Sequence, residues 1–427
     1  MAALDAAPPE WVTEQHAIAA RAFVADDSRL GFELPWDYEI RTRALAEASG
    51  AAATGTADAA SPPAATFLEK LRSGEAAKSF TSPFRRSSAS TGSALPLPLT
   101  CVAGMDISFL KGTTTAVASL VVLSFPSMKV VHSVMHHCQM TVPYIAGFLA
   151  FREVEPLRAT WRMLLDDIFL HKRLEPTCLP QIIFLDGNGV LHYRRCGLAA
   201  HLGVLLEEDL HSGRWGSTGL PSGVAVVGCA KECLNVDGLS RERVRHIFAS
   251  VRYLAGLTCA ERGAALAAGH FLPPGRCDSA EPPAGIDRDE VEATTMSEAE
   301  LGSILAGVVE VRDDCNRQAF YSRPWLSAAG SAAAADAEGA VSCVDPNAVR
   351  HLLIPLRGRT GYLYGYAAMT GRSEAKPIYI SAGHRVTALT ASRLALTMAT
   401  NRVIEPVRQA DLRSRQYIRD AFPASAH

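Results

Sequence analysis

Residues 99–136 read LTCVAGMDISFLKGTTTAVASLVVLSFPSMKVVHSVMH, and this stretch decides the fold. It contains three segments rich in Val, Ala, Leu and Thr, at 100–109, 115–125 and 128–136. Such short β-prone segments, separated by turn residues, predict strands that follow one another and pair antiparallel. The ordered core is therefore expected to begin at Leu99 with a three-stranded antiparallel sheet.

The segments after this sheet alternate between helical and extended patterns. Between 153 and 170, apolar residues recur every three or four positions, which predicts an amphipathic helix. QIIFLD at 181–186 is a continuous apolar run that ends in an acid, as a buried strand does when chemistry sits at its carboxyl end. This order predicts an α/β fold of the ribonuclease-H-like class, with a mixed central sheet flanked by helices and with large inserted loops. Further helices are expected over about 195–206, 239–253 and 386–400, and further strands at 224–229 and in the segments RTGYLYGYAAM and PIYISAG.

The chain divides by composition into core and inserted segments. Residues 46–98 and 258–345 hold many Ala, Ser, Gly and Pro residues, and we expect a low-complexity insertion and a mobile second insertion there. They leave an N-terminal helical segment at 1–45, a first part of the core at 99–257 and a C-terminal part at 346–427.

Composition and charge set broad limits on the protein class. The 427 residues, 48% of them hydrophobic, can bury one large core or two smaller ones, and the net charge of −2 gives no overall attraction to nucleic acid. No apolar run reaches the roughly 18 residues of a membrane-spanning helix, and the N-terminus lacks the basic and apolar regions of a signal peptide. We therefore expect a monomer of the cytoplasm or nucleus, not secreted and without a membrane partner, whose ten cysteines are reduced.

Two of the predicted strands carry an acid at or near their carboxyl ends, Asp106 in VAGMDIS and Asp186 in FLDGNG. A carboxylate in an apolar run costs free energy unless it is paired, hydrogen-bonded or bound to a metal. Each acid alone could equally cap a turn. If the two strands are neighbours, both acids lie at one edge of the sheet, where carboxylate oxygens suit Mg²⁺ or Mn²⁺. Such an ion can activate water and stabilise a leaving oxygen, which phosphodiester hydrolysis requires.

Several blocks of this sequence resemble the endonuclease V family, and they occur in the family's order. They cover most of 100–255 and 350–420. The family's eukaryotic members are the better match at the C-terminal end. The blocks are VAGMDISF (102–109), PYIAGFLAFRE (143–153), DGNGVLHYRRCGLAAHLGVLL (186–206), VGCAK (227–231), YISAGHRV (379–386) and IEPVRQADLRSRQYIR (404–419).

The resemblance implies roles for individual residues. The family's catalytic acids, which would hold the metal, fall on Asp106, Glu153 and Asp186. Its C-terminal active-site histidine falls on His384, which by itself would read as a satisfied histidine at a helix start. Lys231 matches a lysine near the scissile phosphate, a role that suits the compact charge of an ammonium group.

The same resemblance implies a substrate site. A deaminated base must leave the stack to be read, and in the family a wedge fills the gap and stacks on neighbouring bases. Arg194 and Arg195 could be phosphate contacts or solvated charges. The wedge would be Pro143, Tyr144, Ile145 and Ala146, and the base pocket would be lined by Leu149, Gly187, Gly189, His192 and Leu198.

The function implied is metal-dependent cleavage of a nucleic-acid strand at the second phosphodiester bond 3′ to inosine. Ala146 stands where bacterial members have a second proline, and together with the EPVRQAD ending this favours single-stranded RNA over DNA. Two alternatives remain open at this point: another ribonuclease-H-like nuclease that cuts hybrids or junctions, and a nucleic-acid-binding relative without catalysis.

Overall fold

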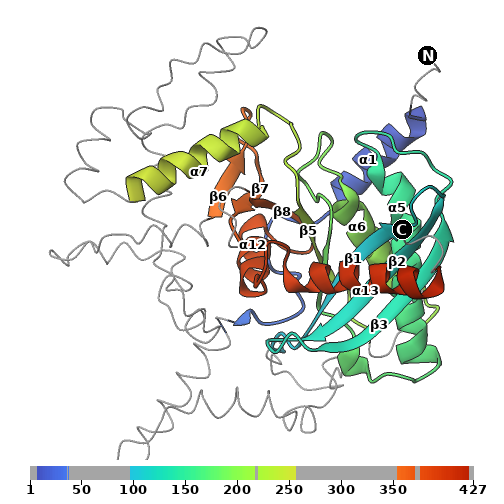
Figure 1. Cartoon of the computed structure of the whole chain (residues 1–427). Helices are drawn as coiled ribbons and strands as arrows, with labels where there is room; N and C mark the ends of the chain where they lie inside the picture. The colour runs from blue at the N-terminus through green and yellow to red at the C-terminus, as the bar shows by residue number, and fades with distance from the viewer. Residues whose placement is uncertain are drawn as a thin grey trace, which may run out of the picture.

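A computed structural model describes residues 7–35, 37, 97–216, 220–255, 353–370 and 376–422 of the chain. Most of the two expected insertions, at 46–98 and 258–345, lies outside these residues. The expected meander is present (Figure 1), because β1 (Cys101–Phe109), β2 (Thr115–Ser124) and β3 (Val130–Gln139) pair antiparallel in sequence.

The meander is one end of an eight-stranded mixed sheet with the order β3-β2-β1-β4-β5-β8-β7-β6. Strands β4 and β5 run parallel to β1, and the other three add antiparallel beyond β5. Three antiparallel strands followed by two strands parallel to the first is the ribonuclease-H-like arrangement, so the predicted fold class is confirmed. The remaining strands are β4 (Ile182–Leu185), β5 (Ala225–Ala230), β6 (Leu353–Arg357), β7 (Leu363–Ala368) and β8 (Ile378–His384).

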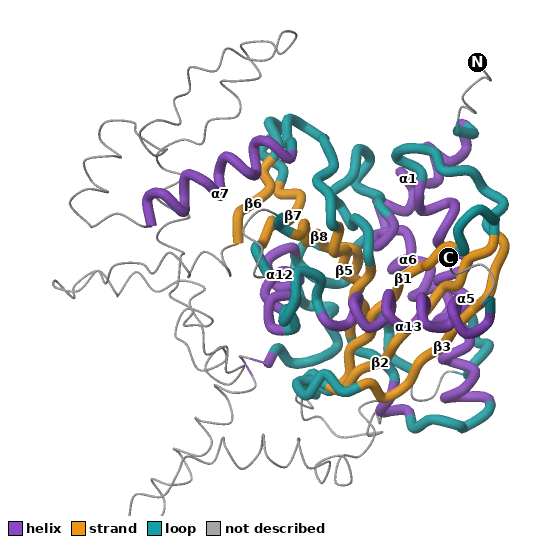
Figure 2. Tube along the Cα trace, viewed as in Figure 1, coloured by secondary structure: helices purple, strands orange, loops and turns teal. Residues whose placement is uncertain are grey.

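Helices cover both faces of the sheet (Figure 2). α5 and α6 pack on one face with α1 outside α6, whereas α12 and α13 pack on the other face. α7 packs near β6. The helices are α1 (Pro9–Arg21), α5 (Leu149–Leu165, continued by a π turn at Asp166–Leu170), α6 (Leu198–His211), α7 (Arg241–Ala255), α12 (Ala388–Thr397) and α13 (Glu405–Ala421), with a short 3₁₀ turn at Pro176–Cys178.

The two faces follow from the alternation of side chains along each strand. Val102 and Phe184 belong to the core beneath α12 and α13. Met105 and Leu185 belong to the core beneath α5 and α6. Since Asp106 is four residues from Val102, it lies on the α13 face of β1.

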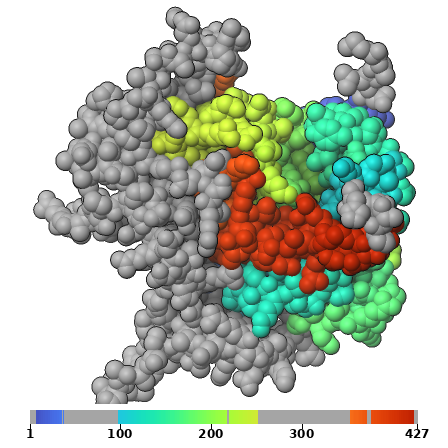
Figure 3. All heavy atoms as spheres, viewed as in Figure 1, coloured from blue at the N-terminus to red at the C-terminus, as the bar shows by residue number. Residues whose placement is uncertain are grey.

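The structure adds two elements that the sequence patterns did not predict, β6 and α13. β6 contains Pro355 and has one neighbour in the sheet, β7, so its hydrophobic pattern is short and broken. α13 has Pro406 in its first turn and an Arg-rich outer face, and it crosses the sheet in front of β1 and β2 (Figure 1). Its side chains form the red band across the face seen in Figure 3. Its buried face is narrow and the rest of the helix is strongly polar, so its hydrophobic pattern is weak.

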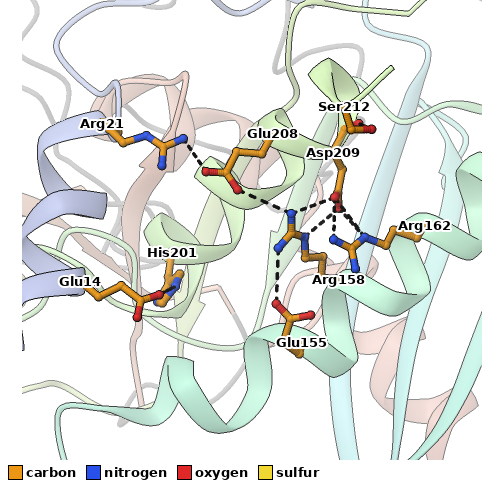
Figure 4. A network of polar contacts seen from close by, with 9 residues as sticks. All are labelled: Glu14, Arg21, Glu155, Arg158, Arg162, His201, Glu208, Asp209 and Ser212. Atoms are coloured by element: carbon orange, nitrogen blue, oxygen red, sulfur yellow. Dashed lines mark hydrogen bonds and ion pairs between the residues drawn. The ribbon is translucent and has the colours of Figure 1, made fainter. Parts of the chain in front are cut away.

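A polar network fixes the helices of one face to each other (Figure 4). Asp209 of α6 is 3% exposed and accepts hydrogen bonds of 2.8–3.1 Å from two arginines of α5, Arg158 and Arg162. Arg158 also approaches Glu208, which is paired at 2.7 Å with Arg21 of α1. The network therefore links α1, α5 and α6.

Six cysteines fall among the described residues, and all six are free thiols, as the sequence predicted: Cys101, Cys138, Cys178, Cys196, Cys229 and Cys233. In the same part of the chain no helix is both long enough and apolar enough to cross a bilayer.

Candidate active site

Asp106 and Asp186 lie side by side at one edge of the sheet. β1 and β4 are parallel neighbours with Met105 opposite Leu185, so the two acids occupy the next positions in register. Neighbouring strands are about 4.8 Å apart. The adjacency that the sequence analysis required for a shared cation is therefore present.

Glu153 reaches the same edge from α5, in the helix that follows the wedge segment. Burial, with the charges of Asp106 and Asp186 added, raises the pKa of Glu153 to about 7, and nearby Arg152 opposes this only in part. Burial, Asp186 and Asp411 likewise raise the pKa of Asp106 to about 7. The carboxylates thus repel one another, and the positive charges nearby offset this repulsion only in part.

Lys231 supplies part of that charge. It follows β5, and its ammonium group forms a hydrogen-bonded ion pair with Asp186 Oδ2. Burial alone would lower the pKa of Lys231, but the charge of Asp186 and its hydrogen bond outweigh burial and raise the pKa. The lysine is therefore charged and lies at the carboxylate edge, where the family pattern put it.

Asp411 of α13 is a fourth acid at this edge, and the sequence analysis did not assign it. Its charge contributes to the raised pKa of Asp106, and its carboxylate accepts a 2.7 Å hydrogen bond from Arg415. The hydroxyl of Ser119 lies within 3.2 Å of the carbonyls of Asp106 and Ala410, which ties α13 to β1 next to the acids. The sequence does contain a signal for Asp411, because it is the acid at the end of EPVRQAD, within the block 404–419 that resembles the family.

The approach of α13 depends on Gly104. A Cβ at this position would lie 1.9 Å from the carbonyl oxygen of Pro406, a backbone atom that cannot move alone. We expect Gly104→Ala to displace α13 and Asp411, to lower stability by about 1–3 kcal/mol, and to slow catalysis. Urea unfolding and cleavage rates of the purified variant check this. If the unfolding free energy and the cleavage rate both equal those of the parent, the close approach of α13 to Gly104 is not needed for stability or catalysis.

His384 does not lie with the acids, and its assignment to the active site is corrected here. In the antiparallel pairing of β8 with β5 it is opposite Val226, near the start of β5, whereas Lys231 follows the end of that strand. The separation along the strand is roughly 16 Å. Both ring nitrogens are also engaged: Nδ1 accepts from the Phe23 amide at 3.2 Å, and Nε2 is hydrogen-bonded to Glu207. His384 anchors the segment after α1 to the core.

The chemistry of the donor set fits a hard divalent cation. In the described ranges, no group of three or more His, Cys, Asp or Glu side chains is arranged so that it could hold a metal ion. However, burial and neighbouring carboxylates raise the pKa values of Asp106 and Glu153 to about 7, and a cation bound beside them would stabilise their charged forms. Oxygen ligands of this kind are those that Mg²⁺ and Mn²⁺ prefer.

The wedge segment is exposed beside this edge. Pro143, Tyr144 and Ala146 are exposed and Ile145 is half-buried, with Tyr144 at 66%. The segment ends at Gly147, whose φ of +79° favours glycine. The predicted wedge thus carries an exposed aromatic ring and directly precedes α5, the helix of Glu153.

The expected pocket residues divide into two groups. Half-buried Leu149 and buried Leu198 begin α5 and α6, and Gly187 and Gly189 lie between them and the sheet. A Cβ on Gly187 would meet Leu198 at 3.3 Å, and a Cβ on Gly189 would meet the Ala382 carbonyl oxygen at 2.0 Å. Both glycines are needed for the loop to pass this closely over β8 and α6.

His192, Arg194 and Arg195 are held by protein contacts. Burial and the charge of Arg194 lower the pKa of His192 to about 4, and the neutral ring contacts the Gly147 carbonyl oxygen at 3.0 Å. Arg194 donates to the same carbonyl at 2.8 Å and to Gln15, and its side chain is half-buried. Arg195 is exposed and stacks on the Tyr362 ring at 3.7 Å.

Comparison with known proteins gives a consistent result. Residues 86–209 and 339–412 match the family model of endonuclease V. Endonuclease V of Homo sapiens is 29% identical over 322 residues, covering 75% of this chain and 72% of the human protein. That of Mus musculus is 30% identical over 319 residues, covering 74% of this chain and 60% of the mouse protein. A solved endonuclease V of Ciona intestinalis, in complex with DNA containing an inosine followed by a ribo-adenosine, is 21% identical, covers 84% of this chain and 98% of its own, and has a TM-score of 0.41. On the match to the family model and the similarity to the human and mouse proteins, the chain belongs to the endonuclease V family and is an endonuclease.

Proposed function

We propose that this endonuclease uses a divalent cation to hydrolyse a phosphodiester bond 3′ to inosine in a nucleic-acid strand, with single-stranded RNA preferred. The observation that carries the proposal is the juxtaposition of Asp106, Glu153 and Asp186 at one sheet edge. The choice of inosine rests on the family, and the choice of RNA on Ala146 in the wedge and on the EPVRQAD ending.

The three acids would hold Mg²⁺, for which Mn²⁺ can substitute, and Asp411 would lie beside them. When bound, the ion activates the attacking water and stabilises charge on the leaving oxygen. Lys231 neutralises part of the charge of the scissile phosphate. To do so, its ammonium group must contact both Asp186 and the substrate. Tyr144 fills the space of the extruded base, and the glycines at 187 and 189 bring backbone groups to its edge.

The proposal is tested with four labelled strands, RNA and DNA, each with and without one inosine. We expect a cut 3′ to inosine in Mg²⁺ or Mn²⁺, faster on RNA, none in EDTA, and none with Asp186→Asn. Equal cutting of the strands without inosine would contradict the substrate, and cutting in EDTA would contradict the metal.

Lys231→Met should slow single-turnover cleavage by on the order of 10²-fold, because a charge at the reacting phosphate is lost. Mn²⁺ affinity should not weaken, since the acids lose a competitor for Asp186. Lys129→Met, at an exposed lysine before β3, is the matched control and should cleave at the parent rate. If Lys231→Met instead weakens Mn²⁺ binding, then Lys231 supports the metal site and does not contact the phosphate.

We place the protein in the cytoplasm or nucleus as a monomer. The free thiols of the described cysteines support a reducing compartment. Fractionation of cells with an antibody to the chain, and light scattering of the purified protein, test the two statements.

A further inference from the structure

Tyr193 is a second exposed aromatic residue beside the wedge. Its side chain is 52% exposed although it belongs to the loop that carries the pocket glycines. A Cβ built on Gly147 would lie 3.5 Å from its Cδ2 atom, so the Tyr193 ring lies close to the residue that directly follows the wedge. Tyr144, also exposed, is three residues earlier. Two exposed tyrosines therefore flank Gly147.

The backbone that carries Tyr193 is clamped on both sides. His192 and Arg194 both bond to the Gly147 carbonyl oxygen, at 3.0 and 2.8 Å. Gln15 of α1, which is fully buried, donates to that carbonyl at 3.1 Å and to the Cys196 carbonyl at 3.2 Å. The loop and the wedge are thus joined at one atom. Because the backbone on both sides of Tyr193 is held, little backbone entropy is lost when a ligand stacks on the ring.

Positive charge follows Tyr193 directly in the sequence. Arg195 is exposed, has a φ of +53°, and keeps its guanidinium over Tyr362. It also donates a hydrogen bond to the Tyr364 hydroxyl, so a phosphate would share the guanidinium with that hydroxyl. An aromatic face beside a cation is the combination that binds unpaired nucleotides, because any base can stack and every nucleotide carries a phosphate.

We infer that Tyr193 stacks on an unpaired nucleobase adjacent to the extruded inosine, while Arg195 contacts a neighbouring phosphate. This inference rests on the proposed function and narrows it. A base next to inosine is free to stack on a tyrosine in a single strand, whereas in a duplex it is paired. Tyr193 therefore contributes affinity for single-stranded substrates and little for duplexes.

The test measures binding of inosine-containing strands in the Asp186→Asn background, where no cleavage occurs. Tyr193→Leu should raise the Kd for a single strand at least about 5-fold, the low end of base–aromatic stacking, and leave the Kd for a duplex unchanged. Tyr193→Phe keeps the ring and should bind as the parent does. Tyr417→Leu, at a 39% exposed tyrosine of α13, is the matched control and should also bind normally.

A second readout reports stacking directly. 2-Aminopurine placed at each position flanking inosine should be quenched at one position by the parent and by Tyr193→Phe, but not by Tyr193→Leu. Parent-like binding and quenching by Tyr193→Leu, or an equal loss on single strand and duplex, would overturn the inference. The proposed function is tested separately, by cleavage of inosine-containing strands with the parent enzyme. That result does not depend on the Tyr193 variants.

Discussion

Asp106→Asn should be slower than the parent in cleavage by on the order of 10³-fold and yet more stable in metal-free buffer at neutral pH. Activity falls because the amide is a poorer ligand for a hard cation and removes one of three shared carboxylates. Stability rises because the parent must fold with repelling charges at one edge, and the amide removes one of them.

The pH dependence follows from the same two groups. The folded-state pKa values of Asp106 and Glu153 are raised to about 7, so the folded protein binds more protons than the unfolded chain above about pH 4. Without metal, the stability of the parent should therefore fall as the pH rises from about 4 to about 7, and then level. Asp106→Asn should show a shallower fall. Mn²⁺ should raise the melting temperature of the parent more than that of the variant.

Asp420→Asn is the control for this experiment, because Asp420 is an exposed acid near the end of α13. It should change neither activity nor metal-free stability. If Asp106→Asn is less stable than the parent in EDTA, favourable contacts of the Asp106 carboxylate outweigh its repulsion by the neighbouring acids, which contradicts this prediction.

Asp209→Ala should destabilise the protein by about 3 kcal/mol, the largest effect expected on stability. Asp209 is buried and is the common partner of Arg158 and Arg162 (Figure 4), so its removal leaves two guanidinium groups without their carboxylate. The helices α5 and α6 lose their main polar connection. Chemical unfolding at neutral pH measures the change.

Glu155→Ala is the matched comparison in the same network. Its side chain is 63% exposed and its contact with Arg158 is 3.4 Å, so the loss should stay below about 1 kcal/mol. Equal effects of the two substitutions would mean that burial does not determine the strength of this network.

The sequence predicts those strands whose hydrophobic pattern is contained within one short segment. β1, β2 and β4 are short, largely apolar runs with clear ends, and in a ribonuclease-H-like sheet that order brings Asp106 next to Asp186. Such strands can be predicted without knowledge of the rest of the fold, because the hydrophobic pattern depends only on residues close together in the sequence.

The parts of the site that were missed depend on contacts between distant segments. His384 and Asp411 both lie in recognised C-terminal blocks, but only the pairing of β8 with β5 shows that His384 is at the opposite edge. Only the packing of α13 on Gly104 brings Asp411 to Asp106. The anchoring of Arg194 by Gln15 likewise joins residues 179 positions apart, which no local pattern reports.

The most direct test of the shared-cation claim is anomalous diffraction from crystals of the protein soaked in Mn²⁺. The carboxylate edge predicts a peak within coordination distance of oxygens from Asp106, Glu153 and Asp186. Manganese bound elsewhere, with these three side chains free of it, would contradict the claim.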